Sequence, residues 1–295
     1  MTQEEYRARF SHWAQLAEER LAQLCDLYLP QQAQIGQAAR YSLLGGGKRV
    51  RAVLALAACE LSGKPAELAV DYACALEMLH CYSLIHDDLP CMDNDDFRRG
   101  RPSCHKQYGE ATALLAADAL VTAAFEVIAH ADLSAESRCR AAAVLAKAGG
   151  ARGMLYGQEL DKKYETQSAT EQELLDLHAH KTGALILAAV ELGCTAGDAD
   201  PAVREAMQCY AAEVGLVFQI VDDILDVTST TEELGKPVGS DAENDKTTFV
   251  SLYGLDGARC LAERHNATAL AALQNLGKEA DFLSMLASEL LQRKK

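Results

Sequence analysis

Two clusters of aspartate set the chemistry that this chain of 295 residues can perform. They are Asp87-Asp88 with Asp93, and Asp222-Asp223 with Asp226, each beside strongly apolar sequence. Adjacent carboxylates repel one another, and burying them without partners is costly. Mg²⁺ takes oxygen ligands, keeps several waters and is commonly shared with substrate phosphates. The clusters therefore predict a Mg²⁺ site.

The second cluster is expected to lie on a helix. At about 100° per residue, four polar side chains fall within an arc of roughly 100° and point the same way. They are Gln219, Asp222, Asp223 and Asp226. A solvated acidic helix end would explain either cluster alone, but two clusters beside apolar helix favour metal binding. A calcium EF-hand is a poor alternative, because the Asp-x-Asp-x-Asp-Gly loop is absent.

The first cluster is expected at the end of another helix. His80, Ser83 and Asp87 share one face of that helix by the same spacing. Pro90 then interrupts the helix. Asp93 is therefore expected on a loop or extended turn that reaches back to the same ion.

Five short stretches supply positive charge between and beside the aspartates. They span residues 45–51, 98–102, 180–183, 235–237 and 245–248. The first, which contains three glycines and Lys48, is not a P-loop, because no Ser or Thr follows the lysine. Singly, these stretches are typical of helix caps, solvated turns and surface lysines. Their alternation with aspartates suits a diphosphate ester held by Mg²⁺ on one side and Arg or Lys on the other.

Composition excludes several other classes of protein. The formal net charge of −15 disfavours nucleic-acid binding, which relies on basic patches. The ten cysteines include no Cys-x-x-Cys pair, so we interpret them as reduced thiols and not as a zinc or disulfide framework. The N-terminus lacks a signal-peptide core, and we expect no apolar run of membrane-spanning length. Cytoplasmic localisation without membrane insertion is the resulting expectation.

The same composition predicts an all-α fold. Ala, Leu and Glu dominate, β-branched residues are sparse, and 49% hydrophobic residues allow a large core. No proline occurs between Ser103 and Asp200, and apolar residues recur at helical spacing. With no linker-like segment, residues 1–295 are expected to form a single domain of ten to twelve helices.

In these motifs the chain resembles the trans-prenyltransferases, the polyprenyl synthetase or isoprenyl diphosphate synthase family. The first and second aspartate clusters match the two aspartate-rich motifs of that family. Its remaining signatures match residues 46–51, Gly157-Gln158-x-x-Asp161, Lys181-Thr182-Gly183 and Phe218-Gln219. Two positions depart from it: Ala52 stands where many relatives have proline, and Asn94 where an aspartate is common, which puts a metal role at position 94 in doubt.

This resemblance implies an all-α bundle around a deep central cavity, usually in a homodimer. It also implies a reaction in which an allylic diphosphate ionises with the help of Mg²⁺ and basic residues. The carbocation-like carbon is then attacked by the double bond of isopentenyl diphosphate, and a proton is lost. Such a reaction needs no protein nucleophile, in agreement with the absence of a Ser-His-Asp or Cys-His motif among the residues singled out.

The resemblance also implies a role for each matched residue. The expected metal ligands are Asp87, Asp88, Asp93 and Asp222, supported directly or through water by Asp223 and Asp226. The expected contacts to the allylic substrate are Arg98, Lys181, Lys236 and Gln219, with Thr182 lining the reacting carbons and Lys246 adding charge. The expected contacts to isopentenyl diphosphate are Lys48, Arg51, His80 and Arg99. The basic end, residues 293–295, either closes over the isopentenyl site or is a frayed terminus.

Product length is expected to depend on the helix before the first cluster. Four residues separate Asp88 from Asp93, and Tyr82 and Ser83 precede Asp87 by five and four positions. In this family that combination resembles farnesyl diphosphate synthases, because a bulky ring can form a floor under the growing chain. Farnesyl diphosphate is therefore the expected product, and geranylgeranyl diphosphate is the alternative. The alternative that Tyr82 is an ordinary core residue, and that other residues form the floor, stays open.

Two rival classes share some of these features. A class I terpene cyclase or a head-to-head synthase would use both aspartate clusters and Mg²⁺, but Lys48, Arg51 and His80 would then have no isopentenyl diphosphate to bind. A non-catalytic subunit of a heteromeric synthase is a second rival, although such a subunit has no need of intact aspartates in both clusters.

Overall fold

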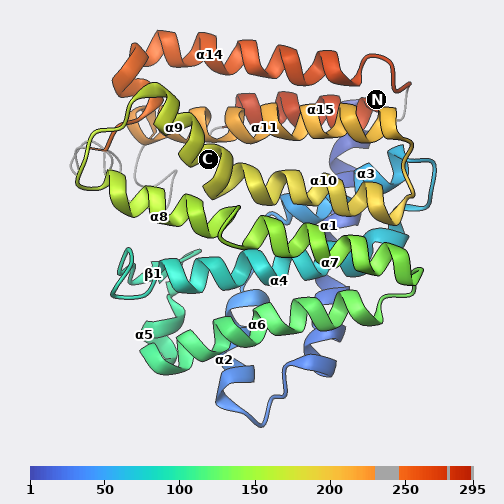
Figure 1. Cartoon of the computed structure of the whole chain (residues 1–295), viewed down its shortest axis with the longest axis vertical. Helices are drawn as coiled ribbons and strands as arrows, with labels where there is room; N and C mark the ends of the chain where they lie inside the picture. The colour runs from blue at the N-terminus through green and yellow to red at the C-terminus, as the bar shows by residue number, and fades with distance from the viewer. Residues whose placement is uncertain (230–245, 278–279, 294–295) are drawn as a thin grey trace. The chain divides into compact units, whose positions relative to one another are not determined.

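The computed structural model of the chain describes residues 1–229, 246–277 and 280–293 (Figure 1). Eleven of the helices in these residues have ten residues or more, and the strands found there are two residues long. The predicted all-α class is confirmed. Packing divides the chain into two compact units. Unit 1 comprises Met1–Tyr6, Ala146–Val190 and Asp200–Lys295, and unit 2 comprises Arg7–Leu145 and Glu191–Ala199. The single domain expected from the sequence stays a prediction.

Most of the N-terminal half of the chain lies in unit 2. Its elements are α1 (Gln3–Tyr28, from Arg7 onward), α2 (Gln34–Leu43), α3 (Val50–Leu61), η1 (Ala66–Ala69), α4 (Val70–Asp87), β1 (Phe97–Arg98), β2 (Arg101–Pro102), α5 (Cys104–Tyr108), α6 (Glu110–His130) and most of α7 (Ala135–Gly149). Helix α4 is the core element, with Leu76 and Met78 fully buried. Helices α4 and α6 lie side by side (Figure 1), and α6 turns small residues such as Ala113 and Ala117 inward.

The C-terminal half of the chain lies mostly in unit 1. Its elements are α8 (Met154–Tyr164), α9 (Glu171–His178), the π-helix η2 (Ala179–Gly183), the first half of α10 (Ala184–Ala196), α11 (Pro201–Thr228), α14 (Phe249–Leu273) and α15 (Asp281–Gln292). Helices α11 and α14 run side by side (Figure 1), and their interface buries Val217, Ile220 and Phe249. Capping boxes at Thr170 and Thr248 start α9 and α14, because each threonine accepts the N–H three residues on.

The expectation that no apolar run approaches membrane-spanning length was wrong for two helices. Among the described residues, Ala66–Asp87 and Glu110–His130 are both long and apolar enough to cross a membrane, by length and composition alone. The first has 72% of its apolar window buried inside the protein, as expected for a core helix rich in alanine and leucine. In α6 only 44% of the window is buried.

Candidate functional site

The first aspartate cluster closes α4. The helix ends at Asp87, Asp88 follows as its C-cap, and the turn after it brings Asp93 back so that its N–H donates to the Asp87 carbonyl at 2.9 Å. Asn94 adopts a positive φ of 54° in this turn, a conformation that asparagine tolerates better than most residues. The loop expected to return Asp93 toward the helix end is present, and its role as a metal ligand stays a prediction.

Asp88 is the most buried member of this cluster, with 2% of its surface exposed. The Nε of Arg98 donates to its Oδ1 at 2.9 Å, and a second guanidinium nitrogen contacts the same oxygen. Burial raises the pKa of Asp88 and this effect prevails over the lowering by Arg98. One arginine therefore does not fully offset the cost of an ionised, buried carboxylate beside Asp87. An added divalent cation fits this donor set, because it supplies the missing positive charge to oxygen ligands.

A tight hairpin places two arginines after this cluster. Strands β1 and β2 are joined by Arg99 and Gly100, whose φ values of 54° and 73° fit the turn with two positive φ angles that hairpins favour. The Arg99 guanidinium donates to the carbonyl of Gly46. A Cβ on Gly47 would lie 2.9 Å from Cζ of Arg99, and Gly47 has a φ of 135°. Glycine is therefore required where this loop meets Arg99.

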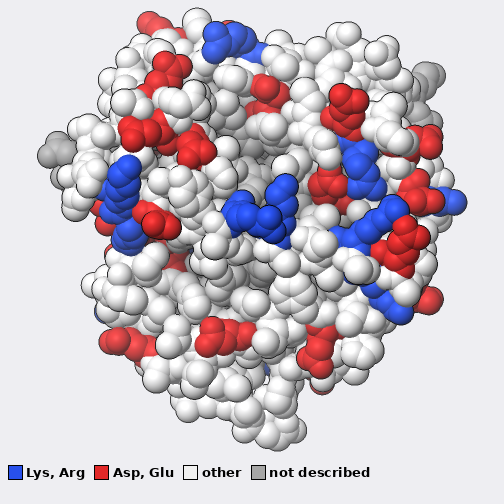
Figure 2. Space-filling model, viewed as in Figure 1, with Lys and Arg blue, Asp and Glu red and all other residues white. Residues whose placement is uncertain are grey.

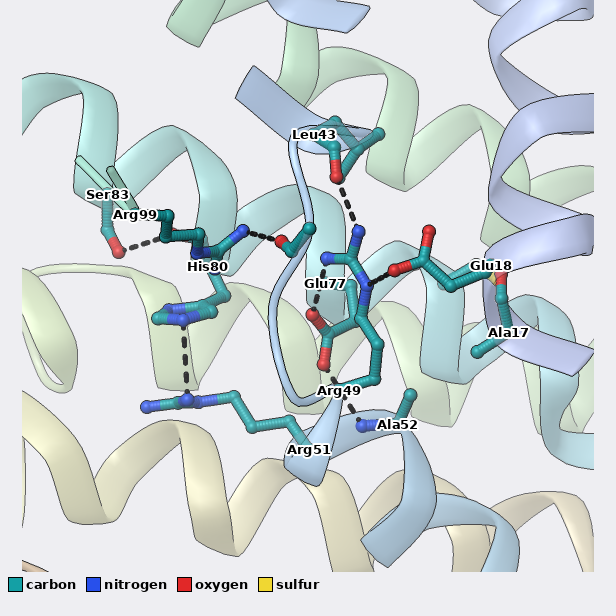
Figure 3. Close-up of polar contacts among 12 residues, drawn as sticks. Ala17, Glu18, Leu43, Arg49, Arg51, Ala52, Glu77, His80, Ser83 and Arg99 are labelled. Atoms are coloured by element: carbon teal, nitrogen blue, oxygen red, sulfur yellow. Dashed lines mark hydrogen bonds and ion pairs between the residues drawn. The ribbon is translucent and has the colours of Figure 1, made fainter. Parts of the chain in front are cut away.

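A group of basic side chains in unit 2 could hold an anion. A guanidinium nitrogen of Arg51 lies 3.3 Å from Nε2 of His80 (Figure 3). Burial lowers the pKa of His80 well below its usual range, and the charges of Arg51, Arg99 and Arg98 lower it further. The ring is thus neutral at ordinary pH in the free protein, beside guanidinium groups whose charge favours a bound anion. Lys48, two residues before Val50, is exposed at the same loop.

The second cluster lies on α11, as the helical spacing predicted. Thr182 donates from Oγ1 to Oε1 of Gln219 at 2.6 Å, and Nε2 of Gln219 donates to Oδ2 of Asp222 at 3.1 Å. These bonds form a polar row from η2 to the acidic face of α11. The row orients one carboxylate oxygen of Asp222 and ties it to Thr182.

Asp223 has a structural role that the sequence did not reveal. Its Oδ2 accepts the backbone N–H of Phe249 at 2.7 Å, and the residue is only 8% exposed. The carboxylate therefore sits at the N-terminus of α14, where the helix dipole favours negative charge. Asp226 is likewise buried, at 2% exposure. Support of a metal ion by either residue stays a prediction.

Lys181 and Thr182 lie on the π-helix η2, an element that is rare and often found at functional sites. Nζ of Lys181 pairs with Oδ2 of Asp161 at 2.5 Å. Burial raises the pKa of Asp161, but Lys181 and Lys246 outweigh it and hold the pKa below its usual range. A Cβ on Gly157 would lie 2.1 Å from the nitrogen of Lys181, so only glycine allows α8 to approach η2 this closely.

These groups line a cavity of about 270 Å³ within unit 1. Five of its lining residues were singled out by sequence for substrate or metal, namely Lys181, Gln219, Asp222, Asp223 and Lys246. Other lining residues received no role in the sequence analysis, among them Asp161, Tyr164, His178 and Thr247. For Asp161 the Gly-Gln-x-x-Asp signature was the available signal. Lys236 lies outside the described residues.

The C-terminal arginine binds the second cluster. Arg293 donates to Oδ1 of Asp222 at 2.5 Å and to the carbonyl of Phe218 at 2.7 Å, and its guanidinium stacks 3.9 Å above the Phe218 ring. These contacts join the end of α15 to the acidic face of α11. Closure over an isopentenyl site stays a prediction, and residues 294–295 lie outside the described part of the chain.

Tyr82 is buried on α4, with 7% of its surface exposed. Its ring meets the edge of His86 at 5.1 Å between centroids. Ser83 is half-buried and donates to the carbonyl of His80 at 2.8 Å. A role for these two residues in product length stays a prediction.

An all-helical fold that carries two aspartate clusters and interleaved arginines and lysines defines a class of diphosphate-processing enzymes. The model of the polyprenyl synthetase family matches residues 32–287, and the chain belongs to this family. It is a prenyltransferase, more narrowly a trans-prenyl diphosphate synthase.

Three relatives illustrate the range of similarity. The farnesyl diphosphate synthase of Micrococcus luteus is 44% identical over 272 residues, which are 92% of this chain and 94% of that protein. The chloroplastic geranylgeranyl pyrophosphate synthase of Capsicum annuum is 49% identical over 243 residues, 81% of this chain and 66% of that protein. The crystal structure of a geranyltransferase from Legionella pneumophila superposes with a TM-score of 0.89 at 36% identity, covering 99% of this chain and 98% of that chain.

Proposed function

We propose that the protein is a farnesyl diphosphate synthase, which condenses dimethylallyl and then geranyl diphosphate with isopentenyl diphosphate. The observation that carries the fifteen-carbon product is the buried ring of Tyr82, five residues before Asp87 on α4. A bulky, well-packed ring beside the path of the growing chain limits its length, because a packed interior yields little to added methylenes. The name of the Micrococcus luteus relative agrees with this product.

In unit 2 we assign the basic residues to the substrate diphosphates and the aspartates to Mg²⁺. Lys48, Arg51 and Arg99 hold the diphosphate of isopentenyl diphosphate, and the neutral ring of His80 donates a hydrogen bond to it. Asp87, Asp88 and Asp93 hold Mg²⁺, and Arg98 exchanges part of its contact with Asp88 for the allylic diphosphate. The buried, partly offset carboxylate of Asp88 supports this exchange.

In unit 1 the proposed roles follow the lining of the cavity. Asp222 binds metal, with Asp223 and Asp226 in support, while Lys181, Lys246 and Lys236 provide positive charge to the allylic diphosphate. Gln219 and Thr182 orient the reacting end of the substrate through the hydrogen bonds that link them to Asp222. The C–O bond of the allylic substrate breaks with its electron pair on the diphosphate, so these cations stabilise the charge that develops.

Mg²⁺, when bound by these aspartates, supplies Lewis-acid stabilisation of the departing diphosphate. The basic residues do the same from the protein side, and they keep the leaving group from recombining with the carbocation-like carbon. The electron pair of the isopentenyl double bond then forms the new C–C bond. The carbocation that this leaves on the isopentenyl unit gives up a neighbouring C–H proton to the released diphosphate, and a new double bond forms.

Geranylgeranyl diphosphate is the second candidate product. Plant relatives with that name are up to 49% identical to the chain, as close in sequence as the bacterial farnesyl diphosphate synthases. The same residues would carry the same chemistry, and the floor of the chain cavity would lie deeper than Tyr82.

We also propose that the protein acts in the cytoplasm as a homodimer without inserting into a membrane. Helix α6 supports the dimer, because it exposes Leu114 and Leu115 at 44% and 53% while its apolar window is only 44% buried. A second copy of the chain would cover this face.

Incubation of the purified protein with dimethylallyl and isopentenyl diphosphates, with and without Mg²⁺, tests the proposal. After dephosphorylation, chromatography should show farnesol as the main alcohol, only when Mg²⁺ is present. Geranylgeraniol as the main alcohol would support the same mechanism, but it would mean that the residues limiting the chain length lie deeper than Tyr82. A cyclic hydrocarbon formed without isopentenyl diphosphate, or no condensation with the metal present, would overturn the assignment.

A further inference from the structure

Arg49 is a buried arginine whose side chain faces away from the neighbouring basic residues. It is 3% exposed, whereas Lys48 beside it is exposed. Its backbone is left-handed, with φ 52° and ψ 30°, at the N-cap of α3, and its own side chain makes no capping hydrogen bond there. A non-glycine residue keeps such a strained conformation only when its surroundings hold it there. The side-chain contacts of Arg49 provide that hold.

The guanidinium of Arg49 reaches three acceptors on three different segments (Figure 3). Its Nε donates to Oε1 of Glu18 on α1 at 2.7 Å. One terminal nitrogen donates to Oε2 of Glu77 on α4 at 3.2 Å, and the other to the carbonyl of Leu43 at the end of α2 at 2.5 Å. The start of α3 is thereby tied to α1, α2 and α4, and the loop between α2 and α3 is held at both ends.

Glu77 binds the chain on both sides of Arg51. Its Oε2 accepts from Arg49, and its Oε1 accepts the backbone N–H of Ala52 in the first turn of α3 at 3.2 Å. One helical turn further along α4, His80 contacts Arg51 itself. Glu77 is 3% exposed. This carboxylate therefore fixes the backbone that carries Arg51 and caps α3 at the end where negative charge is favourable.

We propose that Arg49 and Glu77 are positioning residues for the isopentenyl diphosphate site: they contact no substrate, and they hold residues 48–52 so that Lys48 and Arg51 present their charges beside His80. This inference rests on the proposed function of Lys48, Arg51 and His80. It assigns different tasks to the two arginines of the Gly-Gly-Lys-Arg-x-Arg stretch, one structural and one toward substrate.

A buried ion pair could instead serve only the stability of the fold. Burial lowers the pKa of Arg49, but the hydrogen bond to Glu18 and the charge of Glu77 prevail and keep its guanidinium charged. A second ion pair between α1 and α4 separates the two explanations. Arg20 pairs with Asp71 through two contacts, at 2.7 and 3.2 Å, and its other terminal nitrogen donates to Gln23 on its own helix.

The decisive comparison is Arg49→Lys against Arg20→Lys. Lysine keeps the charge but offers no planar fork, so Arg49→Lys cannot satisfy three acceptors at once. We expect KM for isopentenyl diphosphate to rise on the order of tenfold, as for the loss of one well-oriented charged contact. KM for the allylic substrate and kcat should stay within about twofold. Arg20→Lys should leave all three constants unchanged.

Hydrogen–deuterium exchange of residues 44–52 gives a readout that does not depend on the reaction. Exchange in this segment should increase in Arg49→Lys and not in Arg20→Lys. If Arg49→Lys does not fold, Glu18→Ala replaces it, because Glu18 has a 36% exposed side chain and its truncation removes only one of the three acceptors of Arg49. A smaller change of the same kind is then expected.

The outcomes separate this inference from the function on which it rests. If the wild-type protein does not condense the substrates, the proposed function fails, and exchange alone decides whether Arg49 holds the loop. If the enzyme is active but both lysine variants alter KM and exchange equally, or neither does, the positioning role is wrong.

Discussion

Individual side chains at the candidate site are held by polar contacts within their own unit. Lys181 is paired with Asp161, Asp88 with Arg98, and Gln219 with Asp222. Lys181 and Arg98, two of the cations proposed to bind substrate diphosphate, thus already have a carboxylate partner. Substrate binding therefore exchanges contacts that exist in the free protein, and removing one partner leaves a buried charge behind.

Tyr82→Ala is expected to lengthen the product. Removing the ring deepens the space beside the chain path, so that geranylgeranyl and longer diphosphates should form instead of farnesyl diphosphate. Chromatography of the dephosphorylated products measures the shift. Tyr82→Phe keeps the ring and should keep farnesol as the main product. An active alanine variant with an unchanged product would show that Tyr82 is ordinary core.

His178 should make the protein acid-sensitive. Burial lowers the pKa of His178 to about 4; the charge of Asp161 opposes this lowering, and the charge of Lys181 adds to it. Because the folded pKa lies below the unfolded value of about 6.5, the unfolded chain takes up a proton that the folded chain refuses. The stability contribution is therefore full above that unfolded value and is lost as the pH falls toward about 4.

His178→Phe is expected to reduce this pH dependence. Its ring can keep the stacking on Phe249, whose centroid lies 5.3 Å away, without a titrating group. Urea unfolding should show the wild type losing about 2 kcal/mol more than the variant between about pH 7.5 and pH 5. The exposed His12 offers a control, since His12→Phe should follow the wild type. Parallel curves for all three proteins would contradict the assignment.

At the scale of helices and turns, the sequence could predict those features of the site that are determined within one element. The acidic face of α11 was predicted, because spacing along one helix determines which side chains share a face. The turn that returns Asp93 was predicted from Pro90 alone. In contrast, the cap that Asp223 provides depends on Phe249, which lies far along the chain in another helix. The π-helical form of residues 179–183 and the inward direction of Arg49 likewise depend on tertiary contacts, so no local pattern reveals them.

The end of α15 is expected to compete with metal at α11. Arg293 occupies Oδ1 of Asp222, whose side chain is 41% exposed. An ion pair at such an exposed position contributes up to about 1 kcal/mol. Arg293→Ala should therefore lower the Mg²⁺ concentration needed for half-maximal activity by at most about fivefold.

Mg²⁺ titrations of the initial rate measure this effect. Arg259→Ala removes a surface arginine of α14 that pairs with Asp256, and it should leave the titration unchanged. A higher Mg²⁺ requirement in Arg293→Ala would mean instead that Arg293 assists the bound substrates.

Across the whole molecule, charge is distributed unevenly. The chain has a formal net charge of −15, and acidic side chains are spread over the face shown in Figure 2 while basic ones gather in a few places. A diphosphate substrate is therefore repelled by the protein in general and attracted only at local clusters such as Arg51 and Arg99.

The proposed homodimer follows from a mismatch between the composition of α6 and its burial. This helix has a more apolar window than α4 yet buries a smaller share of it, 44% against 72%. Leu115, 53% exposed, lies on the uncovered face.

Leu115→Glu would place a charge in the centre of an interface formed there, and the cost of desolvating that charge opposes association. We expect a dimer for the wild type and a monomer for the variant by light scattering after size exclusion. Leu27→Glu changes an even more exposed leucine on α1, at 69%, and should remain dimeric; equal masses for all three proteins would place the dimer contact elsewhere or rule it out.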